Sequence, residues 1–308
     1  MITINISVSG GRTSAYMAWW MLNNKPQVAD HLGCTVTDLD YQFTFANTGM
    51  EHEDTLRFLD CVDRHLLENR VVWLEGVVQY GERKSTQHRI VTYETAFRND
   101  QWRDPLHPFH AVIKKYGVSN LTWKCCTREM KLHAMNSYRK SLHPDGYYTA
   151  IGIRADEARR VSKNADAGKI LYPLVDLHPC DKEDVLDWFG EFDWDLAIPE
   201  WQGNCTMCFQ KSLPKLNAVY NETPEAFEFT AYMEKEYGRT GYEFKDGNPD
   251  QKERVFFREH RSTEDMIAIF KQNPSDPERF INVLDDAGCS ESCEMYQTEF
   301  FPLERAVI

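Results

Sequence analysis

The sequence predicts an α/β protein built on an open, doubly wound and mostly parallel sheet, with a helical C-terminal extension. Over residues 1 to about 190, short runs rich in β-branched and aromatic residues alternate with longer amphipathic runs. Beyond residue 213 the strand-like runs end and only helical patterns follow. Hydrophobic residues make up 42% of the 308 positions and charged residues 27%, which is ordinary for a globular protein.

Four segments are expected to form the central strands, because each is short, apolar and rich in residues that favour β-structure. They are residues 2–8, 41–46, 70–74 and 147–153. Residues 172–174 are a fifth segment able to pair with the same sheet. Because helical segments separate the strands, right-handed crossovers would make the strands parallel and cover both faces of the sheet.

Helices are expected between and after these strands. Residues 15–22 are apolar almost all round, and in residues 51–67 apolar side chains recur every three or four positions. Residues 124–138 become helical after two adjacent cysteines, and Asp181 is a suitable N-cap for a helix that runs to Phe189. The polar stretch 76–104 has no clear pattern.

The C-terminal region is expected to be helical and to pack on the α/β core. Thr223 and Pro224 form an N-cap and a first helical position, and the helix they open would run to about Tyr237. Residues 261–270 and 276–284 also have helical patterns. We therefore expect two parts, an α/β domain over residues 1–213 and a helical region over residues 214–308.

Charge and cysteine content exclude several classes of protein. The formal net charge of −13 argues against bulk electrostatic binding to nucleic acid or to an anionic membrane. No run of 18 apolar residues could span a bilayer, and the N-terminus lacks the features of a signal peptide, so we expect a cytoplasmic protein. Nine cysteines, an odd number, are not expected to form a disulfide framework.

A glycine-containing turn follows the first predicted strand at its carboxyl end, where open α/β sheets bind ligands. The glycine turn, as we call residues 9–14, consists of Ser9, Gly10, Gly11, Arg12, Thr13 and Ser14. Its two glycines allow backbone amides to approach an oxyanion, and the following helix adds its positive N-terminal dipole. The sequence matches neither G-x-x-x-x-G-K-[ST] nor G-x-G-x-x-G. A tight turn with a serine cap is the alternative interpretation.

The turn SGGRTS resembles the SGGxxS phosphate loop of the adenine nucleotide alpha-hydrolase-like superfamily. Five further blocks resemble the 3′-phosphoadenylyl-sulfate (PAPS) reductase branch of that superfamily and follow in the family's order over roughly residues 1–215. They are FANTGMEHEDTL (45–56), KCCTREMK (124–131), GIRADEARR (152–160), YPLVDL (172–177) and GNCTMCFQKS (203–212). The resemblance implies a Rossmann-like nucleotide-binding domain.

The resemblance also implies positions for the nucleotide. The glycine turn would hold the phosphates or the sulfonyl-phosphate group of an adenylyl nucleotide. Asn47, Thr48 and Gly49 would lie beside it at the end of the second strand. The anionic end would be lined by Gly152, Arg154, Arg159 and Arg160. Arginine suits bidentate contacts to phosphate. The alternative for the arginines is a solvated helix start with local ion pairs.

Four cysteines form the second constellation. Cys125 and Cys126 are adjacent, and Cys205 and Cys208 form a C-x-x-C pair. This pattern resembles that of the iron–sulfur adenylyl-sulfate reductases, which implies a [4Fe–4S] cluster. Zinc or a cluster held by Cys126, Cys205 and Cys208 is one alternative, and metal-free structural or redox thiols are another.

The sequence departs from the reductases at the C-terminus. Their nucleophilic cysteine lies in a Glu-Cys-Gly-Leu/Ile-His tail, which is absent here. Cys289 and Cys293 are the only cysteines in this region, and their acidic surroundings should raise a thiol's pKa. They are interpreted as peripheral thiols or as a divergent nucleophile and resolving pair.

Three functions follow from these observations. The first is a PAPS reductase-like enzyme that takes electrons from a thioredoxin-like donor. The second is an ATP-pyrophosphatase-type enzyme that adenylates a substrate or transfers sulfur, for which Mg²⁺ would bridge the phosphates. The third is a non-catalytic nucleotide- or cluster-binding module. A nucleic-acid partner is not expected, and a homo-oligomer is left open. His52, Glu53 and His133 are weaker polar candidates, and residues 93–98 could form a lid.

Overall fold

The computed structural model describes residues 1–274 except 82–84, 145, 200, 242–243, 245–246 and 258–259. The expected helix at 276–284, Cys289 and Cys293 lie outside the described residues. Within the described part, six strands form one sheet: β1 (Ile2–Ser7), β2 (Leu39–Asn47), β3 (Val71–Val77), β4 (Gln87–Val91), β5 (Tyr148–Ala150) and β6 (Ile170–Leu171). Their order is β4-β3-β2-β1-β5-β6. Only β3 and β4 pair in antiparallel fashion, so the predicted mostly parallel α/β sheet is confirmed.

The strand order creates a switch point beside β1. Ile6 of β1 pairs with Phe43 of β2 on one side and with Ala150 of β5 on the other. The chain therefore moves outward from β1 to β3 and later returns to the opposite side of β1. Ligands of open α/β sheets bind at such a point, outside the carboxyl ends of the strands. The glycine turn and the segment after β5 both begin at this edge.

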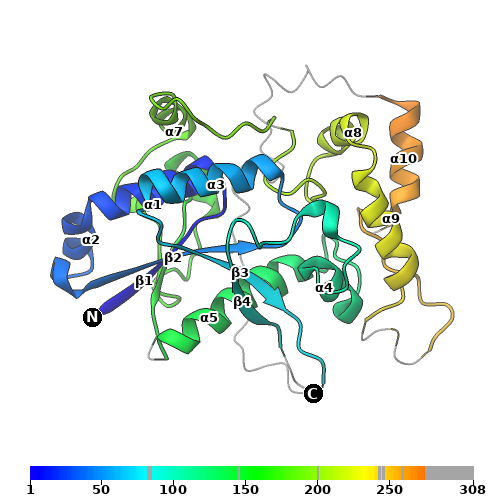
Figure 1. The fold of residues 1–308 in the computed structure, drawn as a ribbon, viewed down its shortest axis with the longest axis horizontal. Coiled ribbons are helices and arrows are strands. Elements are labelled where there is room, and N and C mark those ends of the chain that lie inside the picture. The colour runs from blue at the N-terminus through cyan, green and yellow to red at the C-terminus, as the bar shows by residue number, and fades with distance from the viewer. Residues whose placement is uncertain are drawn as a thin grey trace.

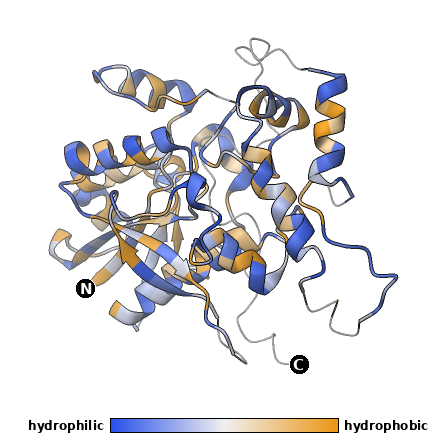
Figure 2. Cartoon of the chain, turned by 45° about the vertical axis from the view of Figure 1, so that its right-hand side comes forward, coloured by the Kyte–Doolittle hydropathy of each residue, from blue (hydrophilic) through white to orange (hydrophobic). Residues whose placement is uncertain are grey.

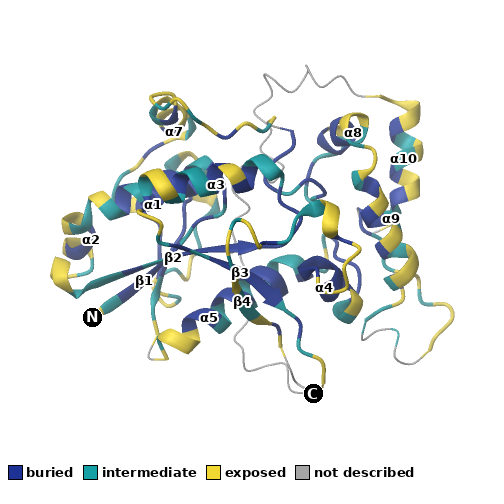
Figure 3. Ribbon diagram, in the orientation of Figure 1, coloured by how far each residue is buried: buried dark blue, intermediate teal, exposed yellow. Residues whose placement is uncertain are grey.

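Helices cover both faces of the sheet (Figure 1). One face carries α1 (Arg12–Asn23), α2 (Lys25–His31), α3 (Glu53–Leu66), α6 (Pro173–Asp176) and α7 (Lys182–Phe189). The other carries η3 (Cys126–His133), which is a π-helix, and α5 (Ala134–Leu142). Residues of α1, α3 and α7 share the largest apolar core with β1 and β2, and Figure 3 shows the buried sides of α1 and α3. In β1 and β2 apolar residues alternate with polar ones, and burial on both faces extends to polar side chains: Asn5 and Thr44 are fully buried, and the Thr44 hydroxyl donates to Asn5 Oδ1 at 2.8 Å.

A second apolar core lies beside the sheet and consists mainly of helices. It joins α4 (Pro108–Tyr116) to α8 (Leu213–Glu222), α9 (Ala226–Tyr237) and α10 (Thr263–Gln272), which gather together in Figure 1. A capping box between Ser262 and Asp265 starts α10, whose middle is hydrophobic in Figure 2. The helical character expected after residue 213 is thus found in the described part. Because this core also contains residues from before 213, the domain boundary remains a prediction.

Several local expectations differ from the structure. Residues 172–174 do not form the last strand: β6 ends at Leu171, and Pro173 starts α6, since proline lacks the N–H that a ladder needs. The unassigned stretch 76–104 contains β4 and the 3₁₀ turn η2 (Asn99–Gln101). Further 3₁₀ segments are η1 (Val36–Asp38) and η4 (Ala155–Arg160). None of the described helices has the length and apolar character that crossing a bilayer requires.

Candidate functional site

The glycine turn closes tightly on itself between β1 and α1. The backbone N–H of Ser9 donates to Ser14 Oγ at 2.9 Å, and Ser14 Oγ lies 3.0 Å from the Gly11 carbonyl oxygen. Gly10 has a φ of +85°, and a Cβ there would lie 2.6 Å from Thr55 Cγ2. Only glycine fits this conformation and this contact. In the described part of the chain no side chain caps α1, so the first amides of the helix remain donors for an anion.

Arg154 connects the segment after β5 to the glycine turn. Its Nη1 donates to Thr13 Oγ1 at 3.1 Å, while Nε and Nη2 donate to the two carboxylate oxygens of Asp156 at 2.9 and 3.0 Å. The Arg154 side chain is only 11% exposed. Two blocks that are 141 residues apart in sequence thus meet at the switch point, and a guanidinium lies against the turn.

The other two arginines of this block lie in η4. Arg160 Nη1 donates to Glu157 Oε1 at 2.5 Å, and Arg159 is exposed. Gly152, which follows β5, is buried. Arg154 is therefore the arginine that the structure brings to the glycine turn, while Arg160 forms the local ion pair that was the alternative interpretation.

The C-x-x-C block reaches the same edge of the sheet. Asn204 Nδ2 donates to the Ser9 carbonyl oxygen at 3.2 Å, and the Asn204 carbonyl oxygen accepts from the His52 N–H at 2.7 Å. Thr206 N donates to the Met50 carbonyl oxygen at 3.1 Å. Residues 204–206 therefore run along the segment after β2, and Asn204 also contacts the glycine turn at Ser9.

Asn47, the first of the three residues predicted to lie beside the nucleotide, is held at the end of β2 by the buried carboxylate of Glu75. Asn47 Nδ2 donates to Glu75 Oε1 at 2.7 Å, and Asn47 Oδ1 accepts from the Gly49 N–H at 3.2 Å. Gly49 has a φ of +79°, and its carbonyl oxygen lies 3.2 Å from His107 Nε2. Burial lowers the pKa of His107 to about 4. A neutral imidazole donor thus packs against the turn that follows β2.

Glu51 is a second buried carboxyl group at this edge, 2% exposed. It accepts from Thr48 N at 2.9 Å and from Thr48 Oγ1 at 2.8 Å, and the Cys205 thiol lies 3.6 Å from its Oε1. Burial raises the pKa of Glu51, and the charge of Lys131 opposes that rise. Lys131 belongs to the KCCTREMK block. Its charge therefore acts on the same cluster as Thr48 and Cys205.

The four cysteines have different surroundings. Cys125 is 1% exposed; its Sγ lies 2.5 Å from Ser119 Oγ within the second core, and burial raises its pKa to about 12. Cys126 Sγ lies 4.0 Å from Thr127 Oγ1, Cys205 lies beside Glu51, and Cys208 is half-buried. Among the described residues no three His, Cys, Asp or Glu side chains are arranged to hold a metal ion. As placed, the four cysteines do not fit a [4Fe–4S] cage, so the cluster and its zinc alternative stay predictions.

Arg12 makes contacts away from the turn's amides. Its Nε and Nη2 donate to Asp195 Oδ1 and Oδ2 at 2.7 and 2.8 Å, and Nη2 also donates to the Leu196 carbonyl oxygen at 2.8 Å. This bidentate pair ties the start of α1 to a segment 183 residues later. Arg12 therefore stabilises the position of the turn, and its role as an anion ligand remains a prediction.

Comparison with known proteins identifies a relative that a phage encodes. It is 30% identical over 303 residues to the uncharacterized nin region protein ORF290 of Escherichia phage lambda, with 94% of each chain covered. The chain belongs to the ORF290 family. No family model matches the sequence, and no solved structure matches it. Because the match to ORF290 covers nearly the whole chain, it takes in both the sheet and the helices around the second core.

Three residues that contact the candidate site of this ORF290-family protein were not identified from the sequence: Asn204, Glu51 and Glu75. Asn204 stands next to the C-x-x-C pair, and Glu51 directly follows the NTGM run, so their positions within the blocks were available signals. Glu75 had no such signal, because an acidic residue near the end of an apolar strand gives no indication that it is fully buried.

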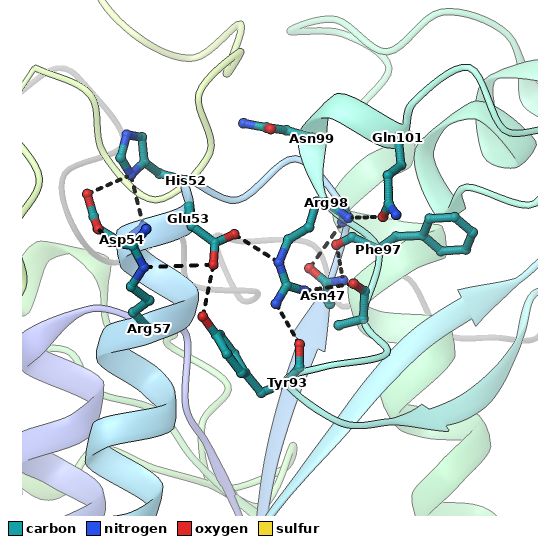
Figure 4. A network of polar contacts seen from close by, with 12 residues as sticks. Asn47, His52, Glu53, Asp54, Arg57, Tyr93, Phe97, Arg98, Asn99 and Gln101 are labelled. Carbon is teal, nitrogen blue, oxygen red and sulfur yellow. Dashed lines mark hydrogen bonds and ion pairs between the residues drawn. The ribbon is translucent and has the colours of Figure 1, made fainter.

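The weaker polar candidates of this ORF290-family chain, His52, Glu53 and His133, all have hydrogen-bond partners in the fold. His52 Nδ1 accepts from the Asp54 N–H at 3.1 Å and caps α3. Figure 4 shows Arg98 reaching Glu53, whose other oxygen accepts from the Tyr93 hydroxyl, each at 2.9 Å. His133 Nδ1 lies 3.1 Å from Glu129 Oε2. Tyr93 and Arg98 both hydrogen-bond to Glu53 of α3, so the 93–98 segment is held at both ends, unlike a loosely held lid.

Proposed function

We propose that this chain is a PAPS reductase-like enzyme that binds an adenylyl sulfonucleotide with its anionic group on the glycine turn. The observation that carries the proposal is the convergence of separate sequence blocks on this turn. Arg154 contacts Thr13, Asn204 contacts Ser9, and both contacts lie where the strand order reverses. A glycine turn that served only as a chain reversal would not need a guanidinium and an amide from two distant blocks.

Electrostatics favour this position for an anion. The chain has a net charge of −13, so a polyanion needs a local source of positive potential. The uncapped first amides of α1 and the Arg154 guanidinium supply it. Asp156, which occupies two nitrogens of Arg154, has a side chain that is 40% exposed. An incoming phosphate can therefore replace this carboxylate on the guanidinium without leaving a buried acid unpaired.

The proposed reaction consumes two thiols of a thioredoxin-like donor. They are oxidised to a disulfide as the sulfonyl group of PAPS leaves as sulfite, and the nucleotide is released with its phosphates. Incubating the full chain with PAPS and reduced thioredoxin should yield sulfite. A parallel reaction with ATP and Mg²⁺ is measured for pyrophosphate. Pyrophosphate without sulfite would replace reduction by the ATP-pyrophosphatase alternative, and tight binding without either product would favour the non-catalytic module.

Replacing Arg154 by alanine is expected to weaken nucleotide binding by about 10- to 100-fold, because charge-assisted hydrogen bonds to phosphate contribute about 1.5–3 kcal/mol. Arg154→Lys should restore part of the affinity, since the charge returns without the planar fork. Calorimetric titration with PAPS, adenylyl sulfate and ATP measures the effect. Arg57→Ala is the matched control, because Arg57 is an ion-paired arginine on α3 whose side chain is 63% exposed. Equal affinities of the Arg154→Ala variant and the wild type would contradict the site.

The metal prediction is tested separately from nucleotide binding. Although the four cysteines as placed do not form a cage, the predicted cluster requires iron and sulfide in anaerobically purified protein. Cys126→Ser should then remove both while leaving nucleotide affinity within about twofold, because the thiol and the turn are different groups. Cys61→Ser on α3 is the control and should retain the metal. Stoichiometric zinc in a colourless preparation would favour the zinc alternative. Protein without iron, sulfide or zinc would favour metal-free thiols.

A further inference from the structure

Polar side chains line the face of the central strands that packs on α5. Ile4 and Ile6 of β1 belong to the large apolar core that α1 shares, so Asn5 between them lies on the opposite face of the sheet. Asn5 and Thr44 of β2 are fully buried on this face, and Thr149 of β5 is 4% exposed. A sheet that helices cover on both faces normally buries apolar side chains. The interface with α5 departs from that composition.

Arg139 of α5 brings a positive charge to this interface and is 2% exposed. Its Nη1 donates to Thr149 Oγ1 at 3.2 Å, its Nη2 lies 3.0 Å from Met135 Sδ, and the guanidinium lies 4.8 Å from the centre of the Tyr147 ring. Among the residues that the structure describes, no Asp or Glu forms an ion pair with Arg139. A buried charge is unfavourable unless an opposite charge or acceptors replace the water it has lost. A hydroxyl, a thioether and an aromatic face do not balance it.

Five side chains form a closed ring of contacts between α5 and the sheet, which we call the Arg139 ring. Thr44 Oγ1 donates to Asn5 Oδ1 at 2.8 Å and lies 3.7 Å from Met135 Sδ. Met135 in turn contacts Arg139, which donates to Thr149. Thr149 is the register partner of Asn5 in the adjacent strands β5 and β1, which closes the ring. Register partners project from the same face of a sheet, so the guanidinium and the Asn5 amide belong to one enclosed cluster.

Two donors of the Arg139 ring are buried and have no hydrogen-bond partner in the described part of the chain. They are Arg139 Nε and Asn5 Nδ2. The Asn5 amide cannot serve as the missing acceptor in this orientation, because its oxygen already accepts from Thr44. Native folds pair nearly all buried donors, and an unpaired one destabilises the fold. A charged donor and a neutral donor in the same cluster indicate a ligand that accepts hydrogen bonds and carries negative charge.

We propose that the Arg139 ring binds a small monovalent anion of the halide class through Arg139 Nε and Asn5 Nδ2. The ion balances the guanidinium and accepts from both donors, whereas a water molecule would supply an acceptor without charge. A monatomic ion suits the site better than a phosphate, because the members of the ring already contact one another. The ion joins α5 to β1 and β5, the strands at the switch point. The site shares no residue with the glycine turn, so it is independent of nucleotide binding.

The melting temperature of the full chain tests the anion site. At constant ionic strength, replacing sodium gluconate by sodium chloride or bromide should raise the melting temperature by about 2–4 °C once the halide is about tenfold above its dissociation constant. Asn5→Asp places a carboxylate next to the guanidinium, where it substitutes for the ion. In gluconate this variant should be at least as stable as the wild type, and halide should not stabilise it further. Arg139→Met removes the charge and should also abolish the halide response.

An exposed arginine provides the control for these substitutions. Arg64 is ion-paired to Asp60 on α3 and its side chain is 54% exposed, so Arg64→Met should keep the full halide response. Crystals grown in sodium bromide should show an anomalous peak beside Arg139 Nε and Asn5 Nδ2. A wild type that halide does not stabilise, or an equal halide response in Asn5→Asp, would overturn the site. A water molecule at this position, or the Asn5 amide oxygen turned toward Arg139, would overturn it as well.

Discussion

Replacing Gly10 by alanine should destabilise the protein by about 2–5 kcal/mol and abolish nucleotide binding at the glycine turn. Two causes add. The φ of +85° is strained for any residue with a Cβ, and the new methyl group would lie 2.6 Å from Thr55 Cγ2. Thr55 is fully buried in α3, so the turn has to move away from it. Urea unfolding measures the loss of stability, and titration with PAPS or ATP measures the loss of binding.

Gly33→Ala is the matched control for the part of the stability loss that comes from backbone strain at a positive φ. Gly33 also has a positive φ, +63°, but a Cβ there would meet no atom within 4 Å. Its substitution should cost only about 1 kcal/mol, from strain alone. Adding Thr55→Ser to Gly10→Ala removes the methyl group that causes the clash and should recover part of the stability. A Gly10→Ala variant that unfolds at the wild-type urea concentration and binds nucleotide normally would show that the turn is not constrained as described.

Replacing Glu75 by alanine should cost about 3–5 kcal/mol, because it removes the buried carboxylate of an ion pair and leaves several donors unpaired. Glu75 is fully buried and accepts from Asn47 Nδ2 at 2.7 Å, from Phe97 N at 2.7 Å and from Arg89 Nε at 2.8 Å. Asn47 would lose the acceptor that holds it at the end of β2. We therefore expect weaker nucleotide binding together with the lower stability.

An exposed ion pair provides the comparison for Glu75. Arg103 and Glu228 lie 2.9 Å apart with side chains 66% and 59% exposed, so Glu228→Ala should change the free energy of unfolding by about 1 kcal/mol or less. Unfolding in urea, followed by fluorescence and by circular dichroism, measures both variants. If the two substitutions have similar costs, the carboxylate of Glu75 does not organise the ends of β2 and β3.

Local sequence patterns predicted most of the central strands and the position of the glycine turn. The apolar run at residues 2–8 became β1, the periodic run at 51–67 became α3, and the glycine turn lies between β1 and α1. These features depend on neighbouring residues, which a single sequence displays directly. Strand β4 was missed because, among the described strands, it pairs only with β3, and because its residues are exposed or half-buried without alternation and lie within a polar stretch.

The chemistry of the site was less predictable, because it depends on residues distant in sequence. Arg12, for example, pairs with Asp195, 183 residues later, a contact that no local pattern indicates, and its predicted role as an anion ligand stays a prediction. The burial of Glu75 is likewise a result of tertiary packing. Charged side chains in a sequence are assigned to the surface by default, and only the assembled fold identifies the exceptions.

The contact between Asn204 and Ser9 has a consequence for the order in which the molecule matures. The first part of the proposed nucleotide site emerges from the ribosome almost at once, whereas its last contributor follows 195 residues later. A nascent or truncated chain that ends before Gly203 would contain the segments of β1 to β6 and still lack the Asn204 contact to the glycine turn. Under the proposed function, affinity for nucleotide is therefore acquired late, and a bound nucleotide would favour the completed chain over its partly folded precursors.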